Sequence, residues 1–164
     1  MIQKFIEGTE ASLTMLVMDG KCLYSCRSLL ETKKFMAGNL GQTVGCSSSI
    51  LWGWPQKAPS LFMKTLNRVK DKWEGITGEI DINFIISDKN GEPYCLEFCP
   101  GRLGYSDIYA TMQILPFEVG KYFSDMAEGK MKPFAYKRGF GGALKITVPP
   151  YPFEKYFPTS SAIS

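Results

Sequence analysis

Two strand–turn–strand patterns constrain the fold of this chain more than any other feature. Residues 11–18 and 21–28 are rich in apolar side chains, and the pair Asp19-Gly20 separates them. This dipeptide favours a tight β-hairpin because both of its positions tolerate a positive φ. Residues 77–86 and 93–99 repeat the pattern. Two such hairpins predict an antiparallel sheet and, with the helices expected below, an α+β fold.

The turn of the second hairpin decides which of its side chains share a face. A two-residue loop would place an aromatic residue opposite Asn83 and mix the polar face with the apolar one. A three-residue loop over residues 89–91 keeps the two faces separate. In this register Glu97 lies opposite Asn83, and Cys99 lies opposite Asp81. We therefore expect a cluster of polar ligands on one side of the hairpin.

Helical periodicity predicts two main helices packed on the sheet. The first is expected to begin near Pro59, which a first helical turn tolerates, and to end at Gly75. The second is expected over residues 106–128, ending near Gly129. The apolar positions of the first helix recur at helical spacing and belong to the core: Leu61, Phe62, Leu66, Val69 and Trp73.

Two other segments have a different character. Residues 36–56 combine glycines with a run of serines and show no apolar period, which predicts a long functional loop. From residue 130 the chain is rich in proline, glycine and aromatic residues, with one short strand expected over 143–148. We therefore divide the chain into a domain over residues 1–129 and a linker with the start of another domain over residues 130–164.

The composition excludes several classes of protein. The chain has no histidine, which removes the commonest general base and every Ser-His or Cys-His nucleophile. Its net charge of +3 comes from scattered lysines and arginines, so no basic stripe indicates a nucleic-acid partner. Neither a signal peptide nor a run long enough to span a membrane is evident. We therefore expect a cytoplasmic protein.

The five cysteines are an odd number in a chain without a secretory signal, and we expect reduced thiols. The pairs Cys22/Cys26 and Cys95/Cys99 have spacings near those of zinc sites. Both pairs lie on expected strands, where residues four apart are separated by about 13 Å. One zinc ion with bonds of about 2.3 Å cannot bridge that separation. A structural zinc protein is therefore a disfavoured alternative, and buried thiols are expected to pack as small hydrophobes.

Several segments together match one enzyme superfamily in order and spacing. They resemble the ATP-grasp superfamily, and most closely its glycinamide ribonucleotide synthetase (phosphoribosylamine–glycine ligase) family, over roughly residues 1–150. The resemblance implies the C-terminal subdomain of an ATP-grasp domain. It also implies an ATP-dependent carboxylate–amine ligase of purine biosynthesis that forms an acyl phosphate. The matching segments are Ile6-Glu7-Gly8-Thr9-Glu10-Ala11-Ser12, Thr77-Gly78, Asn90-Gly91, Leu96-Glu97-Phe98 and the return into a strand after Gly141-Gly142.

The resemblance implies roles for residues at the nucleotide. The backbone of Lys4, Phe5 and Ile6 would meet the adenine edge of ATP. Glu10 would accept hydrogen bonds from the ribose hydroxyls. Lys33 aligns with a basic pair in the acceptor segment of the family and is expected at the bound cofactor.

The resemblance also implies a metal site. Glu97 would bind Mg²⁺ or Mn²⁺, and Arg102 would act as the catalytic residue at the transferred phosphate, where its guanidinium fork suits a dianion. Cys99 stands where the family has an asparagine ligand, and a soft thiol suits a hard ion poorly. Asn83 is expected to complete the protein ligands, because related enzymes carry an acid or amide there. A degenerate module without turnover, serving binding or assembly, stays an alternative.

On this resemblance the N-terminal subdomain, with its phosphate-binding lysines and glycine-rich loop, is expected to lie outside the sequence. We therefore expect a partial ATP-grasp domain that is inactive alone. Its small-molecule partners in the whole protein would be a carboxylate and an amine. Apolar surface that the other subdomain would cover is expected to favour self-association.

Overall fold

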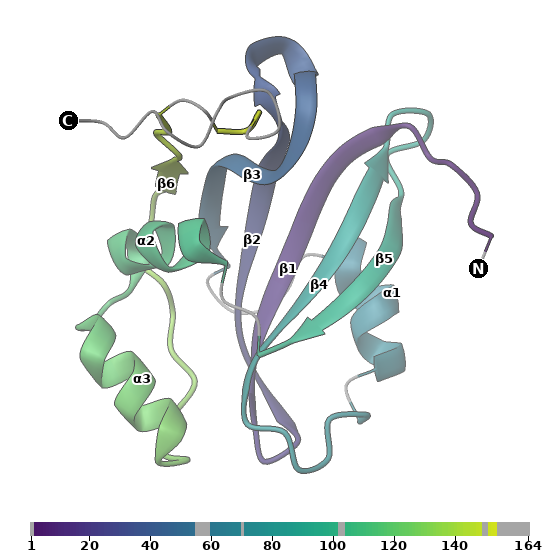
Figure 1. Cartoon of the computed structure of the whole chain (residues 1–164). Coiled ribbons are helices and arrows are strands. Elements are labelled where there is room, and N and C mark those ends of the chain that lie inside the picture. Colours follow the sequence, from purple (N-terminus) through teal and green to yellow (C-terminus); the bar gives the residue numbers. More distant parts are fainter. Residues whose placement is uncertain (1, 55–59, 70, 102–103, 149–150, 154–164) are drawn as a thin grey trace.

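The computed structural model of the chain describes residues 2–54, 60–69, 71–101, 104–148 and 151–153. Within them, strands form one antiparallel sheet in the order β5-β4-β1-β2-β3-β6 (Figure 1). The expected α+β class is confirmed. In chain order the strands are β1 Gly8–Met18, β2 Lys21–Met36, β3 Leu40–Gly53, β4 Gly78–Ser87, β5 Pro93–Pro100 and β6 Gly141–Leu144. The helices are α1 Ser60–Val69, α2 Tyr105–Ile114, α3 Val119–Ala127 and the short 3-10 turn η1 Ala37–Asn39.

β1 and β2 form the expected two-residue hairpin. Met18 pairs with Lys21, and the two turn residues between them have positive φ values of 47° and 75°. β2 then continues to Met36, well beyond its expected end at residue 28. Its additional length forms a curled hairpin with β3 that projects from the sheet at the top of Figure 1.

β4 and β5 have the expected register at the polar cluster, although the loop between them differs. Asn83 pairs with Glu97, and Asp81 pairs with Cys99. The loop contains four residues, 88–91, and not three, because the residues flanking it are joined by a 3.0 Å backbone hydrogen bond. A β-bulge beside Asn83 compensates for the added residue and restores the expected pairing.

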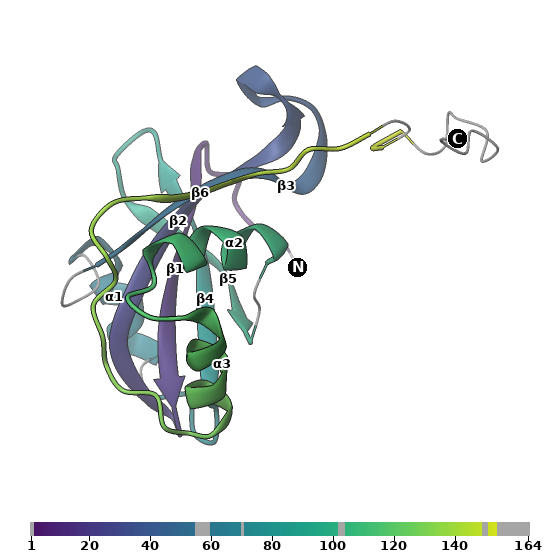
Figure 2. The same ribbon diagram turned by 90° about the vertical axis from the view of Figure 1, so that its left-hand side faces the viewer.

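Helices cover both faces of the sheet (Figures 1 and 2). α1 packs on one face, where Leu13, Ile82 and Phe84 have no exposed surface. α2 and α3 pack on the opposite face, over Leu16 and Leu51. Because side chains alternate along a strand, this second face also carries the polar cluster of β4 and β5. The two hydrophobic clusters therefore lie on opposite sides of one sheet.

The expected loop over residues 36–56 is wrong, because most of this segment is strand β3. Its backbone pairs with β2, and Cys46, Ser49 and Leu51 are buried. Two of these three covered side chains are small, and Cys46 and Ser49 are three residues apart, so the segment shows no regular apolar period. Tertiary pairing supplied the strand that local propensity did not indicate.

The second expected helix, over residues 106–128, forms two helices. α2 ends at Ile114, and Leu115 has the extended conformation with ψ of 136°. Leu115 precedes Pro116, and a residue before proline is kept out of the helical region. Pro116 also lacks the N–H that a continued helix would need.

The first helix is shorter than expected. α1 ends at Val69 and not at Gly75, and Trp73 is buried in the turns that follow it. The expected start at Pro59 lies outside the described residues. None of the helices in the described part of the chain is long and apolar enough to cross a membrane.

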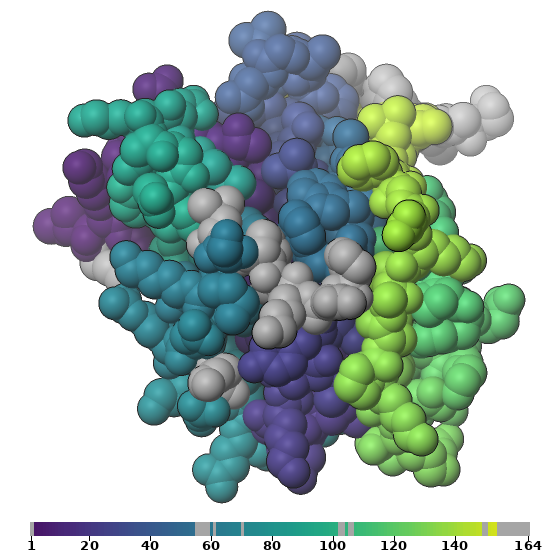
Figure 3. All heavy atoms as spheres, turned by 180° about the vertical axis from the view of Figure 1, so that it is seen from behind, coloured from purple at the N-terminus to yellow at the C-terminus, as the bar shows by residue number. Residues whose placement is uncertain are grey.

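Residues 131–144, which we call the strap, pack onto the same sheet. They run along one side of the molecule toward the projecting hairpin (Figure 3). The Ser25 hydroxyl donates to the Phe134 carbonyl at 3.0 Å and accepts from the Phe134 N–H at 2.9 Å. The strap ends in β6, which begins at Gly141, two residues before the expected strand, and pairs with β3. The division of the chain at residues 129 and 130 stays a prediction.

A buried ion pair joins the sheet to α3 and the strap. Arg27 of β2 contacts both carboxylate oxygens of Glu79 on β4, one of them at 2.8 Å, and each residue is 2 % exposed. The Tyr122 hydroxyl donates to the same carboxylate, and the Tyr136 hydroxyl accepts from Arg27 at 3.4 Å. Burial, with the charge of Glu79, holds the pKa of Tyr122 well above its ordinary value, so this hydroxyl remains a donor.

Candidate functional site

The predicted polar cluster and the predicted ribose acid lie on one face of the sheet. Ser12 pairs with Asn83 across β1 and β4, and Asn83 pairs with Glu97 across β4 and β5. Directly opposed residues point to the same side, and Glu10, two residues before Ser12, shares that side. α2 and α3 cover the other end of this face. We call the end that carries Glu10, Asn83, Glu97 and Cys99 the open face.

Asn83 links the two other candidate metal ligands. Its side-chain nitrogen Nδ2 lies 3.4 Å from Glu97 Oε1 and 3.4 Å from Cys99 Sγ. Glu97 is exposed, and Asn83 and Cys99 are half-buried. The structure therefore brings together the three residues that the sequence predicted for the metal site.

The donors in this cluster suit a hard divalent cation only in part. The Glu97 carboxylate and the Asn83 amide supply oxygen atoms, which Mg²⁺ prefers, whereas the Cys99 sulfur does not suit it. In the described part of the chain, no three Cys, Asp or Glu side chains lie close enough to hold a metal on their own. Mg²⁺ usually keeps several waters and binds one or two protein oxygens together with phosphate oxygens. Glu97 and Asn83 fit that smaller role.

Asp81 is a buried acid beneath the cluster. Its side chain accepts a 2.9 Å hydrogen bond from the Thr14 hydroxyl. Burial raises the pKa of Asp81, although the hydrogen bond from Thr14 and the charge of Arg27 act in the opposite direction. Asp81 is thus held by neighbouring strands, and we regard it as a support for the cluster.

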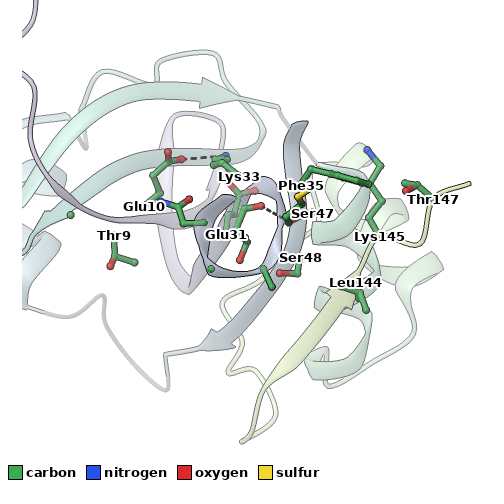
Figure 4. A pocket seen from close by; sticks show the side chains of 16 residues that line it. Thr9, Glu10, Glu31, Lys33, Phe35, Ser47, Ser48, Leu144, Lys145 and Thr147 are labelled. Carbon is green, nitrogen blue, oxygen red and sulfur yellow. Dashed lines mark hydrogen bonds and ion pairs between the residues drawn. The ribbon is translucent and has the colours of Figure 1, made fainter. Parts of the chain in front are cut away.

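A pocket of about 650 Å³ opens beside Glu10. It lies between the start of β1, the curled hairpin of β2 and β3, and the end of β6 (Figure 4). Of the predicted site residues it contains Glu10 and Lys33, whereas the metal cluster does not line it. Its lining combines acidic, basic, hydroxyl and aromatic side chains: Glu10, Glu31, Lys33, Lys145, Thr9, Ser47, Thr147 and Phe35.

Lys33 joins two acids at the mouth of this pocket. Its ammonium contacts the Glu31 carboxylate and lies 3.6 Å from the Glu10 carboxylate, toward which it points in Figure 4. Burial lowers the pKa of Lys33, but the hydrogen bond and charge of Glu31 and the charge of Glu10 outweigh it, so the net shift is upward. Lys33 therefore stays protonated at neutral pH.

Glu31 was not among the predicted site residues. The signal that could have identified it is its spacing of two from Lys33, because residues two apart on a strand point to the same face. The sequence alone did not indicate that a strand continued through this segment.

The far wall of the pocket comes from residues after the strap. Lys145 donates to the Tyr151 hydroxyl at 2.8 Å, and its ammonium lies 4.4 Å from the centre of the Tyr151 ring. That ring packs edge-on against Phe35 of β2 at 6.0 Å. Gln42 of the projecting hairpin donates to the Pro152 carbonyl at 2.8 Å. These contacts hold the hairpin and the segment after β6 together around the pocket.

The predicted adenine segment lies immediately before β1. Lys4 and Phe5 are exposed and Ile6 is half-buried. The next residue, Glu7, is fixed to the turn between β4 and β5, because the Asp88 N–H donates to its carbonyl at 3.1 Å. Arg102 lies outside the described residues, so its catalytic role stays a prediction.

Comparison with solved structures shows the same fold in larger enzymes. A phosphoribosylamine–glycine ligase from Thermotoga maritima superposes with a TM-score of 0.63 and 22 % identity, over 91 % of this chain and 38 % of that one. The biotin carboxylase domain of 2-oxoglutarate carboxylase from Hydrogenobacter thermophilus, solved with MgADP and bicarbonate, gives a TM-score of 0.54 and 17 % identity, over 85 % of this chain and 30 % of that one. Pyruvate carboxylase from Rhizobium etli gives a TM-score of 0.52 and 12 % identity, over 86 % of this chain and 13 % of that one.

These likenesses confirm the expected fold, which this chain shares with part of each of these enzymes. The chain spans well under two thirds of the length of each of these enzymes. No protein-family model matches the sequence. No curated protein matches it either.

Proposed function

We propose that this chain forms one wall of the ATP site in an ATP-dependent carboxylate–amine ligase. The observation that carries the proposal is the open face, where an acid suited to ribose and a carboxylate–amide pair suited to Mg²⁺ share one end of the sheet. The fold that this chain has in common with a phosphoribosylamine–glycine ligase supports the choice of reaction class.

The nucleotide would lie across the open face. The backbone of residues 4–6 would meet adenine, and Glu10 would accept hydrogen bonds from the ribose hydroxyls. The position of this segment directly before β1, against the turn between β4 and β5, supports that order along the nucleotide. Lys33, in ion-pair distance of Glu10, would lie at the same end.

Glu97 and Asn83 would hold Mg²⁺ or Mn²⁺ at the phosphates. When bound, the ion would neutralise charge on the phosphate oxygens and so favour transfer of the terminal phosphoryl group. The Glu97 carboxylate would supply the negative charge that keeps the ion in place. Asn83 orients that carboxylate, because its Nδ2 lies 3.4 Å from Glu97 Oε1. Arg102 would stabilise the transferred phosphate.

The reaction we propose has two displacements. A substrate carboxylate oxygen attacks the terminal phosphorus of ATP, forming an acyl phosphate and releasing ADP. An amine then attacks the acyl carbon and releases inorganic phosphate, leaving an amide and a proton. The pocket beside Glu10 supports a place for these small substrates, since its lining supplies hydrogen-bonding and charged groups on several sides.

A second candidate function is a degenerate module without turnover. The observation that favours it is Cys99, whose sulfur occupies a position next to Asn83 that an oxygen ligand would fill in a working metal site. Self-association is a further proposal for this chain. Large apolar side chains on and beside β3 and β6, with Ile50 54 %, Phe140 74 % and Leu144 74 % exposed, would supply its surface.

The test of the ligase is Glu97→Gln in the longest protein that contains this chain. The change removes one anionic ligand from the ion, and a neutral amide cannot offset the ion's charge. We expect the rate of ATP turnover to fall more than about 100-fold, about 2.7 kcal/mol, with the fold unchanged. Turnover within about threefold of the parent would refute the metal role of Glu97.

The matched control is Glu128→Gln, which neutralises an exposed acid directly after α3. It should leave the rate of turnover unchanged. An equal loss of turnover rate in both variants would mean that the loss comes from the change in net charge and not from a metal ligand at Glu97.

A further inference from the structure

We propose that Lys33 is a positioning residue that holds the Glu10 carboxylate ready for the ribose hydroxyls, and that Glu31 anchors it. This inference rests on the proposed nucleotide site and adds to it a residue that acts through Glu10. The three side chains form one chain of ion pairs from β2 to β1.

The sheet register explains why this chain of contacts exists. Ala11 pairs with Leu30 at the end of the recorded register, and Glu10 and Glu31 are the next residues on the two strands, both near Lys33. Two carboxylates directly opposed on neighbouring strands repel each other. Lys33 lies two residues beyond Glu31 on the same strand and contacts both acids. Its positive charge therefore offsets the repulsion between the two carboxylates.

The exposure of the three side chains increases from Glu31 through Lys33 to Glu10. The Glu31 side chain is 10 % exposed, that of Lys33 22 % and that of Glu10 41 %. All three side chains line the pocket, and Glu10 is the most exposed of them. Glu10 is therefore the member that is free to meet a ligand, and Lys33 limits the positions that its carboxylate can adopt.

The same contacts argue against a direct phosphate contact by Lys33. Its ammonium is shared between two carboxylates, so a phosphate approaching it would also approach two negative charges. Like charges a few ångströms apart near a protein surface repel each other appreciably, because the effective dielectric there is well below that of water. A lysine that clamps phosphate would not be expected to carry two acidic partners.

The experiment compares the Kd of Mg·ADP with that of Mg·2′,3′-dideoxy-ADP, by NMR titration of the full chain with each ligand raised to tens of millimolar. The ratio of the two values measures recognition of the ribose hydroxyls, and we expect a ratio of about 10 or more, since hydrogen bonds to a charged group are strong. Lys33→Met should lower this ratio at least threefold, and Glu10→Ala should lower it to about the same value. The double variant Lys33→Met/Glu10→Ala should have the same ratio as Glu10→Ala alone. Lys33→Arg should retain the ratio of the unaltered chain.

Lys34→Met is the matched control. It removes the same charge from the neighbouring residue and should leave the ratio unchanged. A second comparison, of Mg·ADP with AMP, measures recognition of the β-phosphate. Lys33→Met should leave that second ratio unchanged.

Each other outcome has a definite meaning. If Lys33→Met lowers the preference for ADP over AMP and leaves the ribose ratio intact, Lys33 contacts phosphate and the positioning role is wrong. If the unaltered chain does not distinguish ribose from dideoxyribose, the proposed nucleotide site falls and this inference with it. Should Lys33→Met not fold, Glu31→Gln replaces it, and an unchanged ribose ratio in that variant would overturn the inference.

A measurement without nucleotide separates the ion pairs from the proposed function. Burial lowers the pKa of Lys33, and Glu31 and then Glu10 raise it beyond that effect. Glu31→Gln should therefore lower the pKa of Lys33 more than Glu10→Gln does, in an NMR titration of the ammonium. A Lys33 pKa that neither substitution lowers would overturn the chain of contacts, whatever the nucleotide titrations give.

Discussion

Replacing Arg27 by methionine removes the cation from the buried pair with Glu79. Methionine fills the space of the aliphatic part of the arginine side chain, so the main loss is that of the guanidinium group. Both side chains of the pair are at most 3 % exposed, so water cannot take the place of the guanidinium. The Glu79 carboxylate keeps one donor, the Tyr122 hydroxyl, and loses two bonds from Arg27.

The loss in the free energy of unfolding can be estimated from the two states open to the Glu79 carboxylate in the variant. It either stays charged without its cation or takes up a proton. Protonation of an ordinary glutamate, which titrates near pH 4.3, costs about 3.7 kcal/mol at pH 7 and about 1 kcal/mol at pH 5. The loss of one partner of a buried pair typically costs about 3–5 kcal/mol. We therefore expect a loss of about 3–4 kcal/mol in the free energy of unfolding at pH 7, shrinking toward about 1 kcal/mol at pH 5.

The sign of the pH dependence is definite. A carboxyl group that prefers its protonated form in the folded variant gives stability that is present at low pH and is lost as the pH rises. The difference between variant and parent should therefore narrow from pH 7 to pH 5. Urea unfolding at 25 °C and both pH values, followed by far-UV circular dichroism, measures it.

Two further variants make this prediction refutable. Lys121→Met removes an exposed ion pair with Asp125 on α3 and should cost no more than about 0.5 kcal/mol. The double variant Arg27→Met/Glu79→Gln removes both charges of this pair and should recover at least half of the loss. A cost below about 1 kcal/mol for Arg27→Met at pH 7, or a cost that does not fall at pH 5, would show that the pair is not the buried tie between sheet, α3 and strap.

Two other predictions concern the metal cluster and the junction of β6 with α2. Cys99→Asn should tighten the binding of Mg²⁺-nucleotide in calorimetry of paired proteins, because an amide oxygen suits the ion better than sulfur; unchanged or weaker binding would mean that Cys99 only packs beside Asn83. Gly141→Ala should destabilise the fold by more than about 2 kcal/mol, because its Cβ would lie 2.0 Å from the Ala110 carbonyl oxygen of α2. Gly142→Ala, whose Cβ would meet no atom closer than 3.8 Å, should stay within about 1 kcal/mol of the parent in the same urea unfolding, and equal losses would contradict the argument.

The local parts of the fold could be predicted from the sequence. Asp19-Gly20 and the loop before Pro93 fixed two hairpins, because their residue types demand particular backbone angles. The register of Asn83 with Glu97 could be argued from the need to keep polar and apolar faces apart. The loop was one residue longer than expected, and a β-bulge, which has no local signal, compensated for it.

The parts that depend on distant partners could not be predicted. β3 is a strand because β2 extends alongside it, and its small covered side chains give no apolar period. Arg27 and Glu79 lie far apart in the sequence, and charged residues within strands usually indicate a solvated face. Only the packing of α3 and the strap over them makes them a buried pair.

The candidate site shows the same division. Glu10, Asn83, Glu97 and Cys99 follow from the hairpin registers and from the resemblance, and the structure brings them to one face. The role of Glu31 beside Lys33 needed the unexpected extension of β2. The wall around Lys145 needed the return of the chain after the strap to the projecting hairpin.

The central claim is that this chain supplies one wall of an ATP site, and a titration of ATP with Mg²⁺ into the purified chain tests it most directly. Nucleotide sites need burial on most sides to offset the entropy lost on binding, and charges on a wall open to water are screened. We therefore expect a Kd no tighter than about 1 mM, near −4 kcal/mol. Chemical shifts should change at Glu10 and Glu97 and not at the exposed Glu128 directly after α3. Saturable binding with a Kd in the low-micromolar range would contradict the account, because it would mean that these residues build a complete site.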